Sequence, residues 1–392
     1  MQVKKWRAQA LLAVLLSALF VTAPRAAAFT WPWEGSPWPK SSDNPVAPLD
    51  HPSLETTLGR IDWDVRGGFQ FTVLGDQRAL ADGEWQDLME AMSRARPAFD
   101  RLLFMLDTGD IVDDGQHADQ FGMLREILGP LREVPYLVGL GNHEVRNNRK
   151  PAARANASRF LSSLDPGLSE EAMYYRKDVG PVRFLFLDTN DLVYGDDGGR
   201  ENHTAPLAGS RAEAQMEWLV GQLAEPEESW GSTVAVLHHP FVQSSEKHRG
   251  HALSLWNYMY KGRTLPDILA DGGVDLVLAG HTHTYERFLL EREEDGRRMW
   301  FLNVSGRPRT SFLWIGDGPR RSRDISGHER KWLTRAGWNL AGWSVTQVEN
   351  RNDADQFALL TVDGAGRITL EMFFLDGEGP DGLTRGPAEL LD

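Results

Sequence analysis

Seven polar residues, spread over most of the chain, have the side chains of a metal site built from oxygen and imidazole ligands. Carboxylate, amide and imidazole groups without a thiolate suit Mn, Zn, Fe and similar divalent or trivalent ions. The sequence therefore predicts metal chemistry before it predicts a substrate. The seven residues are Asp76, Asp110, Asn142, His143, His238, His281 and His283. They occur in five short segments: Gly75-Asp76, Gly109-Asp110, Gly141-Asn142-His143-Glu144, His238-His239-Pro240 and Gly280-His281-Thr282-His283.

Each of these segments follows a short apolar run that is typical of a buried strand. Loops at strand ends are where a rigid sheet can hold polar groups that must converge on one point. Amphipathic stretches at Trp85–Arg94, Phe121–Leu128 and Ala212–Leu223 lie between several of the runs. Strands that alternate with helices predict an α/β layered fold. The predicted strands are Phe69–Leu74, Leu102–Leu106, Tyr136–Leu140, Val182–Leu187, Thr233–Leu237 and Val274–Ala279.

The last part of the chain has a different pattern. Trp300–Val304, Ala358–Val362 and Ile368–Phe374 predict further strands. The last two are joined at Asp363-Gly364-Ala365-Gly366, which is typical of a hairpin turn. We expect four parts: a signal at 1–28, an extended Pro- and Trp-rich arm at 29–60, a catalytic domain at 61–310, and a C-terminal segment at 311–392 whose hairpin packs on the core.

The ordered segments resemble those of the calcineurin-like metallophosphoesterases, whose pattern is an Asp, then G-D, G-N-H-[DE], a His before a Pro, and G-H-x-H. The continuation Tyr285-Glu286-Arg287 resembles the purple acid phosphatase branch in particular. The resemblance covers about Phe69–Arg287. It implies two mixed β-sheets packed as a sandwich and flanked by helices, with the site across the edge of the sheets.

The resemblance also implies a role for each ligand. Asp110 would bridge two metal ions, such as Mn, Zn or Fe. Asp76 and His283 would hold the first metal, and Asn142, His238 and His281 would hold the second. His143 would face the substrate, where it would bind a phosphate oxygen or protonate the leaving group. Glu144 could orient His143.

Two positions depart from the family pattern. Many members carry D-x-H at the first segment, but Arg78 stands in place of that His. Purple acid phosphatases instead supply a Tyr three residues after the bridging Asp, where this chain has Asp113. A guanidinium has no lone pair to give to a metal. Water could fill the gap, Asp113 could swing in, or the first metal position could be weak or empty. Arg78 would either bind substrate phosphate or pair with a neighbouring acid.

Several other residues could belong to the site, but a structural role is favoured for most of them. His239 competes with His238 as ligand, and the spacing to Pro240 favours His238. Asp188 is expected to cap a turn, and Tyr285 and Arg287 to brace the GHTH loop. Trp314, Trp332, Trp338 and Trp343 are expected in the core rather than in a pocket. We interpret four further histidines as solvated loop residues: His117, His203, His248 and His251.

Composition predicts an exported protein. Lys4, Lys5 and Arg7 precede the apolar stretch Ala8–Val21 and a small-residue cleavage site at Ala26-Ala27-Ala28. A membrane anchor is the alternative, but the stretch is shorter than the roughly 20 apolar residues that cross a bilayer. No later segment is apolar for long enough to do so. The 392 residues include no cysteine, which fits a bacterial periplasmic or secreted protein better than a eukaryotic secreted one.

The charge and motifs then restrict the function. A net charge of −14 makes binding to long nucleic acid unfavourable. There is no Walker A, G-x-G-x-x-G or G-x-S-x-G pattern, so kinase, hydride-transfer and acyl-transfer chemistry find no support. The leading hypothesis is a phosphoesterase that hydrolyses a small phosphate monoester or diester by attack of metal-bound hydroxide. The alternative is a catalytically weakened phosphoesterase fold that binds a phosphorylated ligand or a partner. No pattern specifies an oligomeric state.

Overall fold

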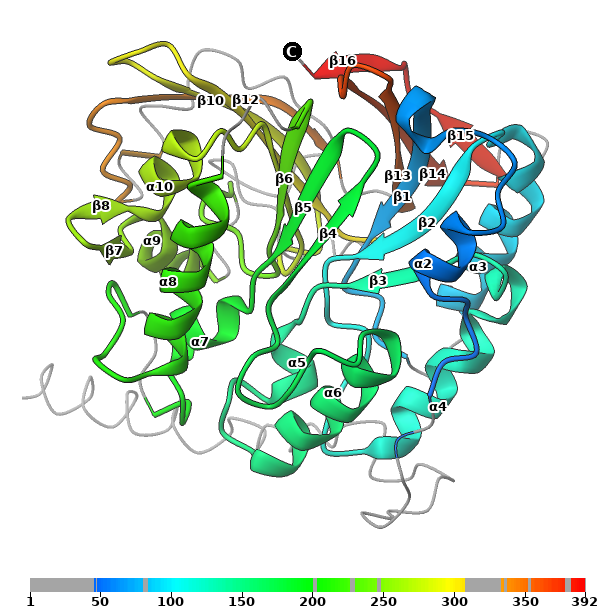
Figure 1. Cartoon of the computed structure of the whole chain (residues 1–392), viewed down its shortest axis with the longest axis horizontal. Helices are drawn as coiled ribbons and strands as arrows, with labels where there is room; N and C mark the ends of the chain where they lie inside the picture. The colour runs from blue at the N-terminus through cyan, green and yellow to red at the C-terminus, as the bar shows by residue number, and fades with distance from the viewer. Residues whose placement is uncertain are drawn as a thin grey trace, which may run out of the picture. The chain divides into compact units, whose positions relative to one another are not determined.

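The computed structural model describes residues 46, 48–79, 84–199, 203–225, 230–244, 248–306, 333–334, 337–351, 354–377 and 382–391 (Figure 1). All of them lie in one compact unit, Ser41–Asp392. The predicted signal at 1–28 and most of the predicted arm lie outside the described residues, as do Trp314 and Trp332.

One of the two large sheets contains the first predicted strands and the end of the chain. Its order is β15-β14-β13-β1-β2-β3, with β16 also paired to β14. The pairs β1–β2 and β2–β3 are parallel, whereas β13 runs antiparallel to β1 and forms the predicted hairpin with β14. The strands are β1 (Gly68–Leu74), β2 (Leu102–Asp107), β3 (Tyr136–Val138), β13 (Asp355–Asp363), β14 (Ile368–Leu375), β15 (Leu383–Arg385) and β16 (Glu389–Leu391).

The other large sheet has the order β12-β10-β11-β9-β6-β5-β4. Its centre, from β11 through β9 and β6 to β5, is parallel, and antiparallel strands extend it on both sides. The strands are β4 (Tyr175–Val179), β5 (Val182–Phe186), β6 (Ser232–Val236), β9 (Leu276–Ala279), β10 (Tyr285–Arg292), β11 (Arg298–Val304) and β12 (Trp343–Arg351). A small ribbon pairs β7 (Met259–Tyr260) with β8 (Arg263–Thr264).

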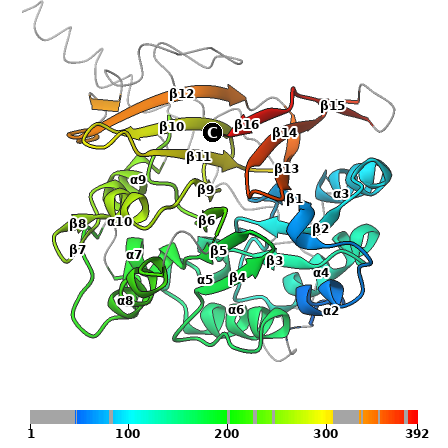
Figure 2. The same cartoon turned by 45° about the horizontal axis from the view of Figure 1, so that its top comes forward.

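The sheets pack face to face through an apolar layer to which both contribute (Figure 2). The rings of Phe71 and Phe104 are stacked, with centroids 5.0 Å apart. Phe184 from the other sheet meets both edge-on, at 5.3 and 5.5 Å. Most residues of β1, β2 and β5 are buried on both faces of their sheets. These strands therefore appear in the sequence as nearly continuous apolar segments rather than alternating ones.

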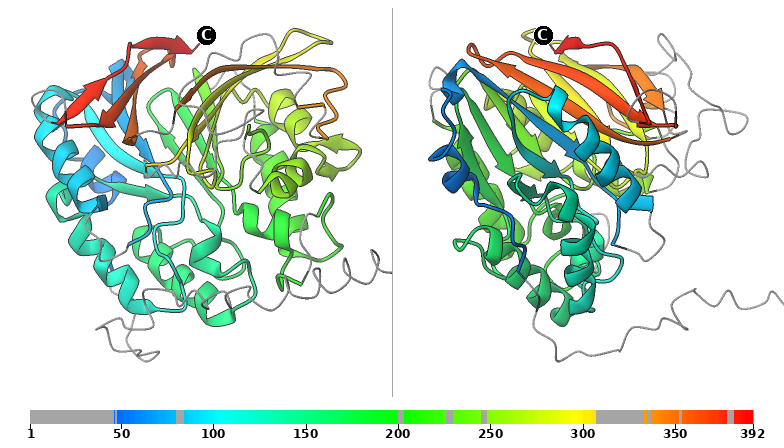
Figure 3. Two further views of the ribbon diagram at one scale, coloured as in Figure 1. Left: turned by 180° about the vertical axis from the view of Figure 1, so that it is seen from behind. Right: turned by 90° about the vertical axis from the view of Figure 1, so that its right-hand side faces the viewer.

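Helices cover the outer faces of both sheets (Figure 3). On the β1–β2–β3 side lie α3 (Glu84–Ala95), α4 (Ala118–Ile127) and α6 (Pro151–Leu164). On the β5–β6–β9 side lie α7 (Thr189–Tyr194), α8 (Arg211–Leu223), α9 (Arg249–Trp256) and α10 (Leu265–Asp271). The short elements are α2 (Leu54–Leu58), η2 (Val65–Gly67), η3 (Arg96–Ala98), η4 (Gly129–Leu131) and α5 (Asn142–Val145).

The predicted fold class is confirmed: this is an α/β sandwich of two mixed sheets with helices outside. The predicted strands and the three predicted helices are all present, with boundaries shifted by a few residues. None of the helices in the described part of the chain is both long enough and apolar enough to cross a bilayer.

Candidate metal centre

The predicted ligand segments follow β1, β2, β3, β6 and β9, so five strands from both sheets deliver them to one place. Four of the ligands, Asp76, Asp110, His281 and His283, have a positive φ between 54° and 70°. This left-handed conformation is uncommon for residues other than glycine and is often found at functional sites. It turns the chain sharply at the end of the strand and aims the side chain inward.

Backbone contacts hold these turns together. The N–H of Asp76 donates to the carbonyl of Gly109 at 2.8 Å, and the N–H of His281 donates to Asp76 Oδ2 at 2.7 Å. A Cβ on Gly280 would lie 2.6 Å from Thr108 Oγ1 and 2.9 Å from Asp76 Oδ2. The glycine before His281 therefore permits the close approach of the two sheets at the site.

The Nε2 atom of His238 lies close to three other candidate ligand atoms. Its Nε2 lies 3.1 Å from Asn142 Oδ1, 3.3 Å from Asp110 Oδ1 and 3.2 Å from His281 Nδ1. Its Nδ1 lies 3.0 Å from the carbonyl of Thr108, which can only accept, so the proton is on Nδ1 and the Nε2 lone pair faces the group. Asn142 Nδ2 donates to Asn147 Oδ1 at 3.0 Å, which turns the amide oxygen inward.

This set fits a metal ion. Bonds of about 2.0–2.2 Å to one ion place neighbouring ligand atoms roughly 3.0–3.4 Å apart, which is the spacing found here. Without a cation or a proton between them, the acceptors Asn142 Oδ1 and Asp110 Oδ1 would face the His238 lone pair at close range. The residues that the resemblance assigns to the second metal are therefore arranged to hold one.

The carboxylates beside this set are deeply buried. Asp76 Oδ2 accepts from the His281 N–H and from Ser305 Oγ, but Asp76 Oδ1 has no hydrogen-bond partner among the described residues. Burial raises the pKa of Asp76 to about 6, although the nearby His238 opposes the rise. Burial alone would also raise the pKa of Asp110, but electrostatic interactions with His143, His238 and Arg78 hold it below its ordinary value. The site thus concentrates negative charge that a cation would neutralise.

His143 is positioned by a different residue from the one predicted. Its Nδ1 lies 2.5 Å from the carbonyl of Asp113, so Nδ1 carries the proton and Nε2 faces Asp110 Oδ2 at 3.8 Å. Burial lowers the pKa of His143. Glu144 instead accepts from the backbone N–H groups of Gly141, Asp110 and Val112 at 2.8–3.0 Å. Glu144 therefore fixes the ligand loops, and the prediction that it orients His143 was wrong.

Arg78 points into the site as well. Its Nη2 lies 3.3 Å from His283 Nε2 and 3.5 Å from Asp110 Oδ2, and its Nη1 lies 3.5 Å from Asp113 Oδ1. The sequence left two roles open for Arg78, binding of substrate phosphate or pairing with a neighbouring acid. In the structure Arg78 pairs with Asp110 and Asp113. Two of the three residues assigned to the first metal position, Asp110 and His283, thus contact a guanidinium, which makes a metal ion less favourable there than at the second position.

Two histidines of the site were missed by sequence reasoning. His251 Nδ1 lies 3.1 Å from His281 Nε2, and the rings of His248 and His281 have centroids 4.2 Å apart. Both were interpreted as solvated loop residues, and this interpretation was wrong. The signal was their spacing of three, which places both at the start of α9, where residues three apart share a face. His117, with 43% of its side chain exposed, is a loop residue as expected.

His203 lies in a loop as expected, but its Nε2 is buried, so the interpretation of it as a solvated residue was wrong. The remaining structural interpretations that concern described residues hold with one exception. Asp188 caps α7 by accepting from the Asn190 N–H, His239 is packed between Thr189 and Tyr194, and Trp338 and Trp343 lie in the core. The exception is the pair beside the GHTH loop. The Tyr285 hydroxyl donates a hydrogen bond to Glu349 of β12, and Arg287 forms a salt bridge with Glu389 of β16 at 2.8 Å. These two residues attach β10 to the C-terminal strands rather than bracing the GHTH loop.

Comparison with known proteins identifies relatives of the same kind. Residues 69–285 match the model of the calcineurin-like phosphoesterase family. Purple acid phosphatase 21 of Arabidopsis thaliana is 29% identical over 228 residues, which are 56% of this chain and 45% of the relative. An uncharacterized protein of Mycobacterium tuberculosis is 26% identical over 247 residues, 57% of this chain and 43% of the relative. The chain thus spans less than half the length of these curated relatives.

Solved structures show the same fold at low identity. The purple acid phosphatase PPD1 from yellow lupin (Lupinus luteus) seeds superposes with a TM-score of 0.51 at 17% identity, covering 78% of this chain and 51% of that one. The structure of PhoD gives a TM-score of 0.50 at 14% identity, covering 82% of this chain and 68% of that one.

Proposed function

Because the chain belongs to the calcineurin-like phosphoesterase family and is distantly homologous to the purple acid phosphatases, we propose that it is a metal-dependent hydrolase of small phosphate monoesters or diesters. The observation that carries the proposal is the convergence of Asp110, Asn142, His238 and His281 with the spacing of metal ligands. When bound, a metal polarises the phosphate and acidifies a coordinated water.

The residues of the chain supply binding and proton transfer. The Nδ1–H of His143 donates to the Asp113 carbonyl. Nε2 is therefore the atom available to hold or deliver a proton at the leaving-group oxygen. The Arg78 guanidinium, with 15% of its side chain exposed, can reach phosphate oxygens with donors in a planar fork. The proposed substrates are small, because the surface charge opposes binding to long nucleic acid.

We also propose that the protein is exported by bacteria to the periplasm or exterior. The support is the charged, apolar and small-residue order within residues 1–28 and the absence of cysteine from the chain. Mass spectrometry of the protein expressed at full length in a bacterial host checks this. A mature N-terminus close to residue 29 supports export, whereas an intact N-terminus in the cytoplasmic fraction contradicts it.

The activity is tested with p-nitrophenyl phosphate and bis-p-nitrophenyl phosphate. The protein is stripped of metal and reloaded with Mn, Zn or Fe. We expect turnover only after reloading, and the preferred ester distinguishes phosphatase from phosphodiesterase. Asn142→Ala is expected to lower kcat by several orders of magnitude, because it removes a metal ligand.

The alternative function is binding of a phosphorylated ligand without turnover. It is favoured by one observation, the guanidinium of Arg78 among the ligands of the first metal position. It predicts no hydrolysis with any metal, together with ligand affinity that survives Asn142→Ala. Metal-dependent turnover contradicts it.

A further inference from the structure

Arg78 occupies an unusual place for a cationic side chain. Asp110 and His283 are two of the three residues that the family pattern assigns to the first metal. The Nη2 of Arg78 contacts both, at 3.5 Å from Asp110 Oδ2 and 3.3 Å from His283 Nε2. The nitrogen bears two hydrogens, so it can donate to both partners at once, although the contacts are long for hydrogen bonds.

The two contacts use the electron pairs that a metal would need. A guanidinium donates only, so the His283 Nε2 that faces it must present its lone pair. A metal ion bound by the same nitrogen and by Asp110 Oδ2 would compete with Nη2 for both. It would also place a second positive charge beside a side chain that is always protonated. The first metal position and the Arg78 guanidinium are therefore mutually exclusive in this arrangement.

The second departure from the family pattern complements the first. Asp113, which stands where the purple acid phosphatases have a metal-binding Tyr, lies 3.5 Å from Arg78 Nη1 through its Oδ1. The backbone adds a further constraint: Arg78 has a φ of 51°, and its N–H donates to the carbonyl of Asp110 at 2.9 Å. The two positions at which one or other branch of the family supplies a further metal ligand thus hold an Arg–Asp pair in this chain. The pair holds a fixed positive charge beside Asp110.

We infer that this chain binds a single metal ion, held by Asp110, Asn142, His238 and His281, and that the guanidinium of Arg78 takes the place of the other ion. The inference deepens the proposed function and rests on it for the identity of the site. In this arrangement Arg78 contributes the positive charge that the first metal gives to the phosphate in dinuclear relatives. A phosphate would then be held between one metal and one guanidinium.

The number of metal ions per chain tests the inference. The metal-free protein is saturated with Mn²⁺ and desalted, and its metal content is measured by inductively coupled plasma mass spectrometry. Electron paramagnetic resonance then distinguishes an isolated Mn²⁺ from a coupled pair. We expect one ion per chain with an uncoupled spectrum. In Arg78→His, which restores the D-x-H of the family, we expect two ions and a coupled spectrum.

Controls separate this effect from metal bound elsewhere. Arg132→His places a histidine at an exposed arginine, 68% accessible, and should leave the content at one ion. Asn142→Ala should lower the content below one. If Arg78→His fails to fold, Arg78→Gln keeps a neutral polar side chain there and should admit a second, weaker ion.

The outcomes are distinct from those of the activity assay. Two coupled ions in the wild-type protein would overturn the inference, whether or not the protein is active. One ion in both the wild type and Arg78→His would show that Arg78 does not exclude the other. One ion without turnover on any ester would leave the inference standing and contradict the proposed hydrolysis. No bound ion at all would overturn both.

Discussion

At the scale of single residues, the site is held together by contacts between segments that are distant in sequence. The sequence alone shows that Asp76, Asp110 and His238 each follow an apolar run. The structure brings these three side chains together. The role of Glu144 was not predictable, because it depends on where three backbone N–H groups turn. The spacing of His248 and His251 indicated a shared helix face, but the contact of His251 in α9 with His281 joins segments distant in sequence, which no local pattern encodes.

His143→Ala tests the assignment of the proton donor. The site retains its metal ligands, so metal content should be unchanged, whereas kcat should fall by about 10²–10⁴-fold, the usual contribution of a positioned general acid. Steady-state kinetics on p-nitrophenyl phosphate with metal analysis of the same samples measures both. His117→Ala removes an exposed histidine and serves as the matched control. A variant that loses its metal together with its activity would place His143 among the ligands instead.

At the scale of elements, strands dominated by apolar residues were predictable, and a strand with several charged residues, β10, was not. β5 and β6 consist mainly of buried apolar residues, although β5 includes Arg183, and such runs are recognisable without neighbours. β10 carries Glu286, Arg287, Glu291 and Arg292, so its sequence does not resemble a core strand. The charges are compensated by partners distant in sequence, such as Arg287 with Glu389 and Glu286 with Asn303. Glu286 and Arg287 can be buried in β10 only because the assembled sheet supplies their partners.

Gly280→Ala tests the close approach between the sheets. The added methyl would lie 2.6 Å from Thr108 Oγ1 and 2.9 Å from Asp76 Oδ2, closer than van der Waals contact. Overpacking of this kind typically costs about 1–3 kcal/mol of unfolding free energy. We expect a lower midpoint in urea and a weaker affinity for Mn²⁺ by calorimetry. Gly122→Ala is the control, because a Cβ there meets nothing within 4 Å. Equal effects of the two substitutions would contradict the packing argument.

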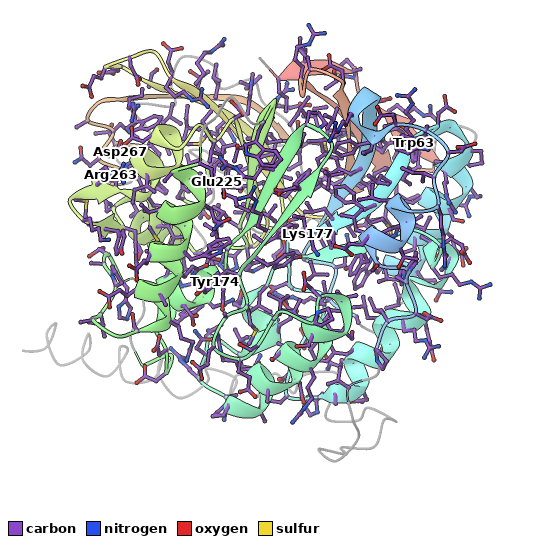
Figure 4. The ribbon with its side chains drawn as sticks, viewed as in Figure 1. Trp63, Tyr174, Lys177, Glu225, Arg263 and Asp267 are labelled. Carbon is purple, nitrogen blue, oxygen red and sulfur yellow. The ribbon has the colours of Figure 1, made fainter. Side chains whose placement is uncertain are left out.

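Lys177 on β4 connects three elements through its ammonium group (Figure 4). It lies 2.8 Å from Glu55 Oε1 of α2 and 2.8 Å from Asp165 Oδ2 at the end of α6. Burial alone would raise the pKa of each carboxyl, but the hydrogen bond and charge of Lys177 lower the pKa of both below the ordinary values.

Lowered carboxyl pKa values imply a stability that is lost in acid. The unfolded chain binds protons more readily than the folded one, so the contribution is complete above the ordinary carboxyl pKa of about 4 and disappears as the pH falls further. Exposed partners limit it to about 1 kcal/mol, or roughly 2 °C in Tm. Calorimetry of Lys177→Met should show a lower Tm than wild type at pH 6 and a smaller difference at pH 3. Lys177→Arg should behave like wild type. A difference that is constant with pH would contradict the ion-pair account.

At the scale of the whole molecule, the sandwich was predicted through the family resemblance, and the strand alternation alone gave only an α/β class. The aromatic layer explains why the two sheets form one unit. Phe184 from one sheet packs edge-on against the stacked rings of Phe71 and Phe104 in the other, so the two sheets share one apolar core. The ligands come from both sheets, and the site therefore depends on this layer.

Phe184→Ala tests this coupling. Loss of a buried ring typically lowers the free energy of unfolding by about 3–5 kcal/mol. In urea, tryptophan fluorescence and far-UV circular dichroism should still change together, at a lower concentration than in the wild type. Leu207→Ala, at a leucine that is 53% exposed, should change the midpoint by less than about 0.5 kcal/mol. Separate transitions for the two probes would show that the sheets unfold independently.

The pairing of β1 with β13 also governs how the chain can be made. Gly68 of β1 pairs with Asp363 of β13, and Asp76 follows β1 directly. During synthesis β1 leaves the ribosome long before β13 exists, so the nascent chain exposes an open strand edge beside the future site. All the proposed metal ligands precede residue 284, but the sheet that positions Asp76 is completed only when β13 has been translated.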